Sequence, residues 1–486
     1  MINIMKMSQK FYLTTTLPYV NAIPHVGHTL EFVQADVIAR YMRQKLGNDN
    51  VYFNVGTDEH GLKIFRKAKK EGLEIQDYVD KYAEKWKEFC ELLQISYDRF
   101  IRTTDTDHIK SATEFWETCD EAGDIYKKKY EGLYCVGCEE FKTEKDLVDG
   151  KCPAHQKEPE KYSEENYFFK FSKYQNKLLE LYKKNANFVK PKSKLKEMTS
   201  FVSSGLEDFS ISRRKENLPW GVPVPGDDEQ VMYVWFDALV NYITTIGYGS
   251  NEEKFEKWWP CVQLCGPDNT RFQSAMWQAM LMSAGIEPSD QILVHGMILA
   301  EDGTKMSKTI GNVVSPFDLI ERYGVDAVRY YLVAGIPTFS DVAFSYKQLE
   351  SEYRGDLQNN FGNLLNRIIT LIKKREVEID ESRVDSNFKK KVDEYVENYT
   401  EFMDQFVLYD AMKKVEELGT YGNRYIAEEE PWAKNIRHEE AEEVLNNLHY
   451  LVRRMIVCYS PVLPEKCKKA EQALKNLENV ILFEKI

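Results

Sequence analysis

The amino-acid sequence predicts an α/β protein that ends in an all-helical domain. A run of residues that favour β-strands at 11–16 precedes a helical pattern to about Lys45, and Val51-Tyr-Phe-Asn-Val then has the character of a second buried strand. Ile292-Leu-Val-His295 is a further strand candidate, and helical periodicity dominates from about Tyr346 to the end. Strands that alternate with helices favour a doubly wound parallel sheet. We therefore expect a split Rossmann-like domain, an insertion between its halves, and a C-terminal α-helical bundle.

Changes in composition and pattern divide the chain into five predicted segments. The insertion is polar and rich in Lys, Glu and Tyr, and Val231-Met-Tyr-Val-Trp235 is expected to resume the sheet as a strand after it. The predicted boundaries are 1–117 for the first half of the α/β domain, 118–228 for the insertion, 229–300 for the second half, 301–345 for a loop and connector, and 346–486 for the helical domain.

Composition restricts the cellular setting and the partners. The 486 residues carry a net charge of −13, which argues against indiscriminate nucleic-acid binding but leaves the lysines between Lys183 and Lys196 as a candidate local RNA surface. The chain start lacks the apolar core of a signal peptide, and no run of about 18 apolar residues follows. We expect a cytoplasmic protein with no membrane segment, whose nine cysteines form no disulfides.

Two histidines open the first predicted helix, in the sequence His25-Val-Gly27-His28. Residues three apart lie on one face of a helix, and a helix start has unpaired N–H groups that favour anions. Imidazoles there can donate hydrogen bonds to a phosphate, and Gly27 would let a base or ribose approach the backbone. A chance pair of histidines, or half of a metal site, is the alternative for this pattern alone.

A second motif, Lys305-Met-Ser-Lys308-Thr, lies in a polar loop between Gly303 and Gly311, which could act as hinges. Two lysines on a mobile loop can close on a triphosphate and stabilise the charge that develops as pyrophosphate leaves. A plain solvated basic loop is the alternative for this pentapeptide.

The insertion carries a pattern typical of a zinc knuckle. Cys135-Val-Gly-Cys138 is followed, after thirteen residues, by Cys152-Pro-Ala-His155. Two such pairs supply four ligands of tetrahedral type, and a closed set of four protein ligands predicts one structural Zn²⁺. A coincidence of surface cysteines in a reducing compartment is the alternative.

The histidine and lysine motifs resemble the HIGH and KMSKS signatures of class I aminoacyl-tRNA synthetases. The segments Thr16–His28, Tyr233-Val-Trp235-Phe-Asp237-Ala238 and Glu430-Pro431-Trp432 narrow the resemblance to the methionyl-tRNA synthetase family, over the chain from Phe11 to the end. This resemblance implies a class I catalytic domain with an anticodon-binding bundle. It also implies activation of L-methionine with ATP and Mg²⁺, and transfer of the methionyl group to the 3′-terminal adenosine of tRNA(Met).

The resemblance also implies roles for single residues. His25 and His28 would contact the ATP phosphates, and Lys305 and Lys308 would close on the departing pyrophosphate, with Lys308 the more essential cation. Further ATP contacts would come from Gly27, Gly266 and Asp268. The Asp58 carboxylate and the Leu17 carbonyl would hold the substrate ammonium. The side-chain pocket would be lined by Tyr19, Trp235, Ala238, Tyr242 and His295, and the anticodon would be bound by Asn363, Arg367, Pro431 and Trp432.

Ordinary packing is the alternative for three of the pocket residues. Trp235 and Tyr242 have the pattern of core aromatics, and His295, which follows an apolar strand, could be a satisfied core histidine.

Departures from the family pattern leave alternatives open. The family usually has Gly-Lys-Asp and then Phe-His, where this chain has Gly266-Pro267-Asp268 and Phe272-Gln273, and Leu239 replaces a common proline. The rival hypotheses are a class I enzyme that adenylates another amino acid, one with a non-tRNA acceptor, and a non-catalytic tRNA-binding protein. Intact histidine and lysine motifs disfavour the last. The chain end resembles the family's minimal form, so we expect a monomer.

Overall fold

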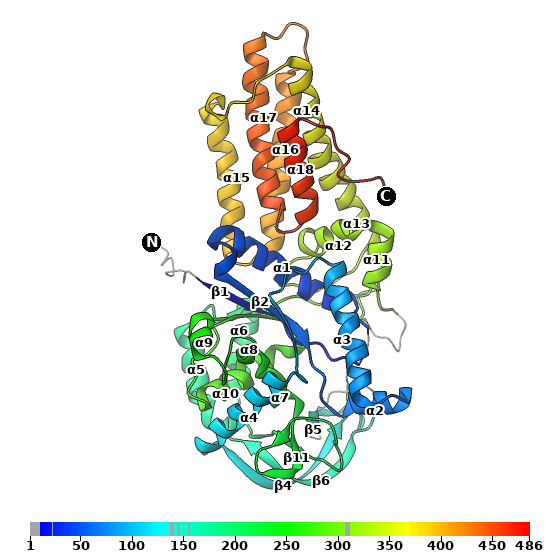
Figure 1. Cartoon of the computed structure of the whole chain (residues 1–486), viewed down its shortest axis with the longest axis vertical. Coiled ribbons are helices and arrows are strands. Elements are labelled where there is room, and N and C mark those ends of the chain that lie inside the picture. Colours follow the sequence, from blue (N-terminus) through cyan, green and yellow to red (C-terminus); the bar gives the residue numbers. More distant parts are fainter. Residues whose placement is uncertain (1–9, 22, 137–139, 143–145, 154–155, 307–311) are drawn as a thin grey trace. The chain divides into compact units, whose positions relative to one another are not determined.

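The computed structural model describes residues 10–21, 23–136, 140–142, 146–153, 156–306 and 312–486 (Figure 1). The chain divides into two compact units: unit 1 comprises Met1–Pro24 and Leu46–His295, and unit 2 comprises His25–Lys45 and Gly296–Ile486. Within these described ranges, no helix is both long and apolar enough to cross a bilayer.

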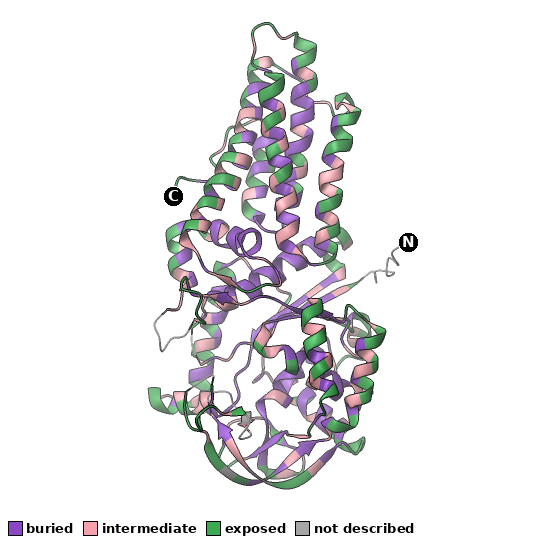
Figure 2. Ribbon diagram, turned by 180° about the vertical axis from the view of Figure 1, so that it is seen from behind, coloured by how far each residue is buried: buried purple, intermediate pink, exposed green. Residues whose placement is uncertain are grey.

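Unit 1 is built on a six-stranded sheet in which every neighbouring pair of strands is parallel, in the order β3-β2-β1-β12-β13-β7. The strands are β1 Phe11–Thr14, β2 Val51–Thr57, β3 Arg99–Arg102, β7 Val189–Lys190, β12 Val262–Cys265 and β13 Gln291–Val294. The central strands are almost wholly buried (Figure 2). The order reverses at β1, with the later strands on its other side, which confirms the predicted split, doubly wound sheet.

Helices of unit 1 connect these strands and support their ends. They are α2 Leu62–Glu71, α3 Ile75–Leu92, α4 Thr106–Glu121, α5 Gln175–Lys184, α6 Lys192–Ser203, α7 Val234–Leu239, α8 Asn241–Thr244, α9 Glu252–Trp258 and α10 Trp277–Ser283. A π-helical turn at Phe272–Met276 leads directly into α10.

Apart from β7, which belongs to the large sheet, the strands of the predicted insertion form two small antiparallel sheets. One has the order β5-β4-β6-β8 and the other the order β10-β11-β9. Their strands are β4 Ile125–Cys135, β5 Glu140–Lys142, β6 Glu160–Phe169, β8 Phe209–Ser210, β9 Ser212–Arg214, β10 Pro223–Val224 and β11 Asp227–Met232.

The predicted strand at Val231–Trp235 is wrong. Its first two residues end β11 in the small sheet, whereas Trp235 lies in α7, and β12 is the strand that resumes the large sheet. A short run that is apolar at every position fits a buried strand and a buried helical turn equally well, so its pattern could not decide between them.

Unit 2 is predominantly helical, as its periodicity predicts. Its elements are α1 Val26–Leu46, β14 Ile298–Leu299, α11 Pro316–Tyr323, α12 Val325–Tyr330, β15 Val342–Ala343, α13 Tyr346–Glu352, α14 Asn363–Arg375, α15 Ser386–Asp404, α16 Leu408–Glu429, α17 His438–Tyr459 and α18 Pro464–Asn476. The long helices bury one side and expose the other (Figure 2).

Helix α1 is anchored to the rest of unit 2 by polar contacts. The fully buried Arg329 of α12 donates to Asp36 of α1 over 2.6 Å. The same guanidinium donates to the carbonyl of Val462 over 2.8 Å. At the far end of the helix, Tyr41 and Lys45 each donate to the Asp404 carboxylate over 2.6 Å. The histidine motif at the start of α1 is therefore fixed to the helical bundle of unit 2.

Candidate active site

Predicted site residues of unit 1 follow the carboxyl ends of the large sheet's strands. Leu17 and Tyr19 follow β1, Asp58 follows β2, Gly266 follows β12 and His295 follows β13. Because these strands are parallel, their carboxyl ends meet at one edge of the sheet, where such folds bind ligands.

The segment after β1 runs beside the end of β2. Asp58 donates its backbone N–H to the Pro18 carbonyl over 3.0 Å, and Val20 donates to the Asp58 carbonyl over 3.2 Å. Tyr19 and Asp58 thus form a parallel bridge beyond the strands, and the Asp58 side chain is buried. The structure therefore brings together the two elements that were predicted to hold an ammonium group.

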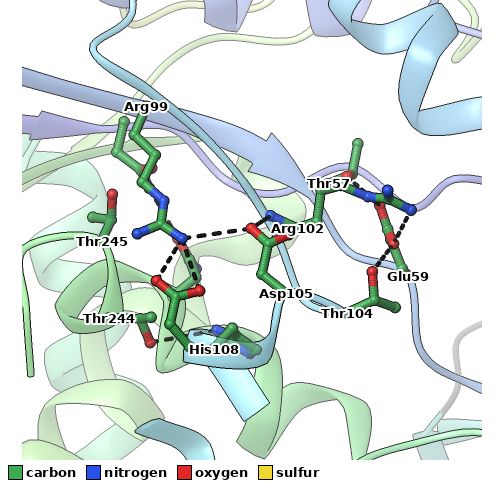
Figure 3. Close-up of polar contacts among 12 residues, drawn as sticks. Thr57, Glu59, Arg99, Arg102, Thr104, Asp105, His108, Thr244 and Thr245 are labelled. Carbon is green, nitrogen blue, oxygen red and sulfur yellow. Dashed lines mark hydrogen bonds and ion pairs between the residues drawn. The ribbon is translucent and has the colours of Figure 1, made fainter. Parts of the chain in front are cut away.

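Glu59, which follows Asp58, has a structural role. Its buried carboxylate accepts Arg102 Nε over 2.7 Å and Nη2 over 2.8 Å, and it also accepts the hydroxyls of Thr57 and Thr104 (Figure 3). A carboxylate that accepts two parallel guanidinium bonds and two hydroxyls is fully satisfied. Of the two adjacent acids, Asp58 is therefore the one suited to a ligand.

Tyr19, whose backbone pairs with that of Asp58, belongs to a group of aromatic rings. The Tyr19 and Trp235 rings meet edge to face with centroids 6.2 Å apart, and Phe272 stacks on Trp235 at 3.9 Å. Trp235 is half-buried, and its Nε1 has no hydrogen-bond partner among the described residues. Ala238 lies buried three residues further along α7. This arrangement gives an aromatic wall with one small residue beside it.

Tyr242 connects to this wall through the π-helical turn. Gln273, which follows Phe272, donates from Nε2 to the Tyr242 hydroxyl over 2.6 Å. The residue that replaces the family's usual histidine is therefore a direct partner of a predicted pocket residue. His295 is also buried, and its Nε2 lies 3.5 Å from the position that a Cβ on Gly266 would occupy. Asp268 is exposed in the short turn Pro267–Asn269.

A buried group of two histidines and one aspartate supports the same wall. Asp237 of α7 contacts His60 Nδ1 at 2.9 Å and His108 Nε2 at 3.1 Å. Burial alone would raise the pKa of Asp237, but the interactions with both histidines outweigh burial and hold the pKa below its ordinary value. The local sequence does not reveal this group, although Asp237 lies in the Tyr233–Ala238 segment and His60 closely follows Asp58.

In unit 2, His25 and His28 stack face to face, with ring centroids 3.8 Å apart. Nδ1 of His25 accepts the Gly27 N–H over 3.2 Å, and Nδ1 of His28 accepts the His25 N–H over 3.3 Å. Since each neutral imidazole carries one proton, these contacts place the protons on Nε2, which makes both Nε2 atoms donors. A Cβ on Gly27 would lie 3.1 Å from the His25 ring, so glycine lets that ring lie over the backbone.

The lysine loop is partly described. Lys305 is exposed and forms an isolated bridge with Leu299, and Asn312 Nδ2 donates to the Lys305 carbonyl over 3.4 Å. Val26 donates its N–H to the carbonyl of Val314 over 3.3 Å, so the start of α1 contacts the chain just beyond this loop. Lys308 lies outside the described residues.

Of the four predicted zinc ligands, Cys135 and Cys152 are described and both are buried. Cys135 ends β4, and Cys152 follows a tight turn in which Val148 and Lys151 exchange backbone hydrogen bonds. Cys138 and His155 lie outside the described residues, and those that are described contain no cluster of three metal-ligand side chains. The zinc site stays a prediction.

A hollow of about 440 Å³ on the bundle is lined by three of the four predicted anticodon residues, Pro431 being the exception. Its lining comprises Asn363, Asn366, Arg367, Thr370, Leu371 and Trp432. The Trp432 side chain is 40% exposed, with the Arg367 guanidinium 5.6 Å from its ring centroid. Arg375 donates to the carbonyl of the buried Pro431 over 3.0 Å, which fixes the turn that presents this indole.

A split parallel sheet, paired histidine and lysine motifs and a helical bundle are the parts of a class I aminoacyl-tRNA synthetase. Residues 11–161 and 145–369 match the family model described as "tRNA synthetases class I (M)". Residues 379–482 match the "Anticodon binding domain of methionyl tRNA ligase". The chain belongs to the methionine–tRNA ligase family.

Known relatives match along nearly the whole chain. The methionine–tRNA ligase of Caldanaerobacter subterraneus is 40% identical over 99% of this chain and 76% of its own length. That of Thermotoga maritima is 41% identical over 94% of this chain and 74% of its own length. A Mycobacterium tuberculosis methionyl-tRNA synthetase, solved in complex with methionyl-adenylate, is 35% identical, with a TM-score of 0.90 over 96% of this chain and 93% of its own.

Proposed function

We propose that this chain activates L-methionine with ATP to methionyl-adenylate and transfers the methionyl group to the 3′-terminal adenosine of tRNA(Met). Family membership over nearly the whole chain supports this activity. The observation that carries the choice of amino acid is the backbone bridge that sets Asp58 next to Tyr19, whose ring meets that of Trp235 edge to face.

Methionine would be recognised at two points, its charged α-ammonium group and its thioether side chain. The Asp58 carboxylate and the Leu17 carbonyl would accept the α-ammonium, because both follow neighbouring parallel strands. The unbranched thioether suits aromatic walls, since sulfur makes favourable contacts with ring edges. Tyr19, Trp235, Ala238, Tyr242 and His295 would line its path.

In the activation step, an oxygen of the methionine carboxylate attacks the α-phosphorus of ATP, and the bond to the β-phosphate breaks to release pyrophosphate. The Nε2–H groups of His25 and His28 would donate to phosphate oxygens whose charge increases in the transition state. Lys305 and Lys308 would stabilise the departing pyrophosphate, and Gly266 and Asp268 would contact the nucleoside. Mg²⁺ bound with ATP would neutralise phosphate charge.

In the transfer step, a hydroxyl of the terminal adenosine attacks the activated carbonyl and AMP leaves. The helical bundle would bind the other end of the same tRNA. An indole that is 40% exposed is a stacking platform for an unpaired base, and Asn363 and Arg367 can donate to base edges.

We also propose one structural Zn²⁺ in the insertion, held by Cys135, Cys138, Cys152 and His155. The donor set fits zinc, because two of the ligands are buried thiols at the end of a strand and after a tight turn. Such an ion would stabilise the local fold and take no part in the reaction.

Amino-acid-dependent ATP–pyrophosphate exchange, measured for all twenty amino acids without tRNA, tests the proposal. We expect exchange with methionine alone, followed by charging of tRNA(Met) when tRNA is added. Exchange with a different amino acid would reject the pocket assignment, and charging of a non-tRNA acceptor would reject the second step.

A further inference from the structure

A buried carboxylate ties together three segments of unit 1 that are distant in the sequence. Asp237 of α7 contacts His60 Nδ1 at 2.9 Å and His108 Nε2 at 3.1 Å. We call these three residues the aspartate bridge, and all of them are at most 4% exposed. His60 lies between β2 and α2, whereas His108 lies in the first turn of α4, which follows β3. The bridge thus joins α7 to the two segments that follow β2 and β3.

A carboxylate suits the middle of this bridge. Burial would raise the pKa of Asp237, but the two histidines hold the pKa below its ordinary value, so the carboxylate is ionised at neutral pH. An ionised carboxylate only accepts hydrogen bonds, so His60 donates from Nδ1 and His108 donates from Nε2. An amide would offer one acceptor and would turn an N–H toward the other ring. The bridge therefore has one arrangement of donors and acceptors.

His60 is itself held in place by its neighbours. The Glu59 carboxylate, one residue earlier, accepts two bonds from Arg102, and Trp220 Nε1 donates to the Glu59 carbonyl over 2.6 Å. The Trp220 ring also meets the His60 ring edge to face, with centroids 5.5 Å apart. The segment from Asp58 to His60 therefore has little freedom to shift.

His108 is held through the start of α4. Arg99 of β3 contacts Asp105 at 3.5 Å and Asp107 at 2.7 Å, which fixes the first turn of α4 (Figure 3). Both histidines are therefore tied to the large sheet, and through them the sheet positions Asp237.

The bridge connects the two ends of the proposed amino-acid site. Asp58, which would accept the α-ammonium, lies two residues before His60. Trp235 and Ala238, which would contact the side chain, lie on either side of Asp237 in α7. A shift of Asp237 relative to His60 would therefore move the wall of the pocket relative to the group that holds the charge.

We propose that the aspartate bridge sets the separation between Asp58 and the pocket wall on α7, and that this separation selects the length of the amino-acid side chain. The inference rests on the proposed methionine pocket. The residues of the bridge are positioning residues, because they act through Asp58 and the α7 wall. An apolar pocket separates side chains that differ by one methylene by about 10- to 200-fold, and a misplacement of about 1 Å is enough to lose much of such a factor.

The test compares three thioether amino acids in ATP–pyrophosphate exchange: methionine, S-methylcysteine, which is one methylene shorter, and ethionine, which is one methylene longer. All three keep the α-ammonium and the sulfur, so the comparison isolates length. We call the ratio of kcat/KM for methionine to that for each analogue the length selectivity. The wild-type protein should have the highest kcat/KM for methionine.

Amide substitutions can displace the donors of the bridge without removing them. The amide nitrogen of asparagine takes the place of histidine Nδ1, and that of glutamine takes the place of Nε2. His60→Asn and His108→Gln therefore keep each donor where it is and should keep the length selectivity. His60→Gln and His108→Asn move the donor and should lower the length selectivity about three- to tenfold, mainly through a higher KM for methionine.

The matched control is the same pair of substitutions at His449, a half-buried histidine of α17. His449→Asn and His449→Gln should both keep the length selectivity. His60 and His108 test the bridge separately, so the comparison at one position stands if a variant at the other does not fold.

Three results would overturn the inference. If asparagine and glutamine have the same effect on the length selectivity at both positions of the bridge, the place of the donor does not matter. If the variants lower exchange with all three amino acids by one common factor, the bridge has a merely structural role. If the wild-type protein shows exchange with none of the three amino acids, the proposed function fails and the inference fails with it.

Discussion

Glu352 is a buried carboxyl whose replacement should stabilise unit 2 in a pH-dependent way. It lies at the end of α13, and its Oε1 accepts Gln348 Nε2 over 2.9 Å. Burial raises the pKa of Glu352 to about 7, and the neighbouring carboxylates Asp356 and Glu416 add to the rise against the opposing effects of Gln348 and Lys413. Above about pH 7, the folded protein must therefore hold an ionised group in an unfavourable environment.

The magnitude follows from proton linkage. Because the folded-state pKa near 7 lies above the ordinary value of 4.5, the folded state binds the proton more tightly than the unfolded state. The associated stability is fully present below pH 4.5 and is lost as the pH rises through about 7. At pH 8 the ionised carboxyl lowers the free energy of unfolding by about 3 kcal/mol, and Glu352→Gln removes this cost.

Thermal unfolding at two pH values checks this reasoning. Glu352→Gln should raise the unfolding midpoint by about 6 °C at pH 8 and by about 2 °C at pH 5. Glu350→Gln is the matched control on the same helix; Glu350 accepts from Arg322 over 3.3 Å, so its loss should bring no gain at pH 8. An equal change of the Glu352 variant at both pH values would refute the argument.

Three further outcomes are expected. Arg375→Ala frees the turn at Pro431–Ala433, so KM for tRNA in aminoacylation should rise about tenfold while ATP–pyrophosphate exchange stays unchanged. Arg329→Met leaves the buried Asp36 carboxylate without its main partner and should lower the free energy of unfolding in urea by about 3 kcal/mol. Cys152→Ala should lose the one equivalent of zinc that elemental analysis is expected to find in the wild-type protein.

Matched variants control for these effects. Lys374→Ala removes an exposed cation next to Arg375 and should leave KM for tRNA unchanged. Arg354→Ala removes a mostly exposed partner of Glu350 and should change the free energy of unfolding by less than about 0.5 kcal/mol. Tight retention of zinc by Cys152→Ala would contradict the proposed ligand set.

Helices and strands with a long periodic pattern, or with clear turn residues at their ends, could be predicted from the sequence. The helix to about Lys45 is confirmed as α1, Val51-Tyr-Phe-Asn-Val as part of β2, and Ile292-Leu-Val as part of β13. Val231–Trp235 was wrong because its five apolar residues carry no period. Strand β12 could not be predicted, because the four residues Val262–Cys265 are too few to show a periodic pattern.

In the candidate site, contacts between residues close in the sequence could be predicted, whereas contacts between distant residues could not. His25 and His28 could be paired from their spacing alone, because three positions on a helix determine the contact. Asp237 meets His60 and His108 across 177 and 129 positions, and no local pattern encodes such contacts. The sequence shows that Gln273 differs from the histidine usual in the family. Its hydrogen bond to Tyr242, however, depends on a π-helical turn that no sequence pattern predicts.

The anchoring of α1 has a mechanical consequence. The helix carries the two histidines at one end, and along its length Arg329 and Asp404 tie it to the bundle that carries Trp432. Within unit 2, the two histidines, for which we propose contacts to phosphate, and Trp432, for which we propose stacking on a base, therefore belong to one body. If the proposed roles hold, a rotation of the bundle on binding tRNA would displace the histidines as well, because α1 is tied to the bundle through Arg329 and Asp404.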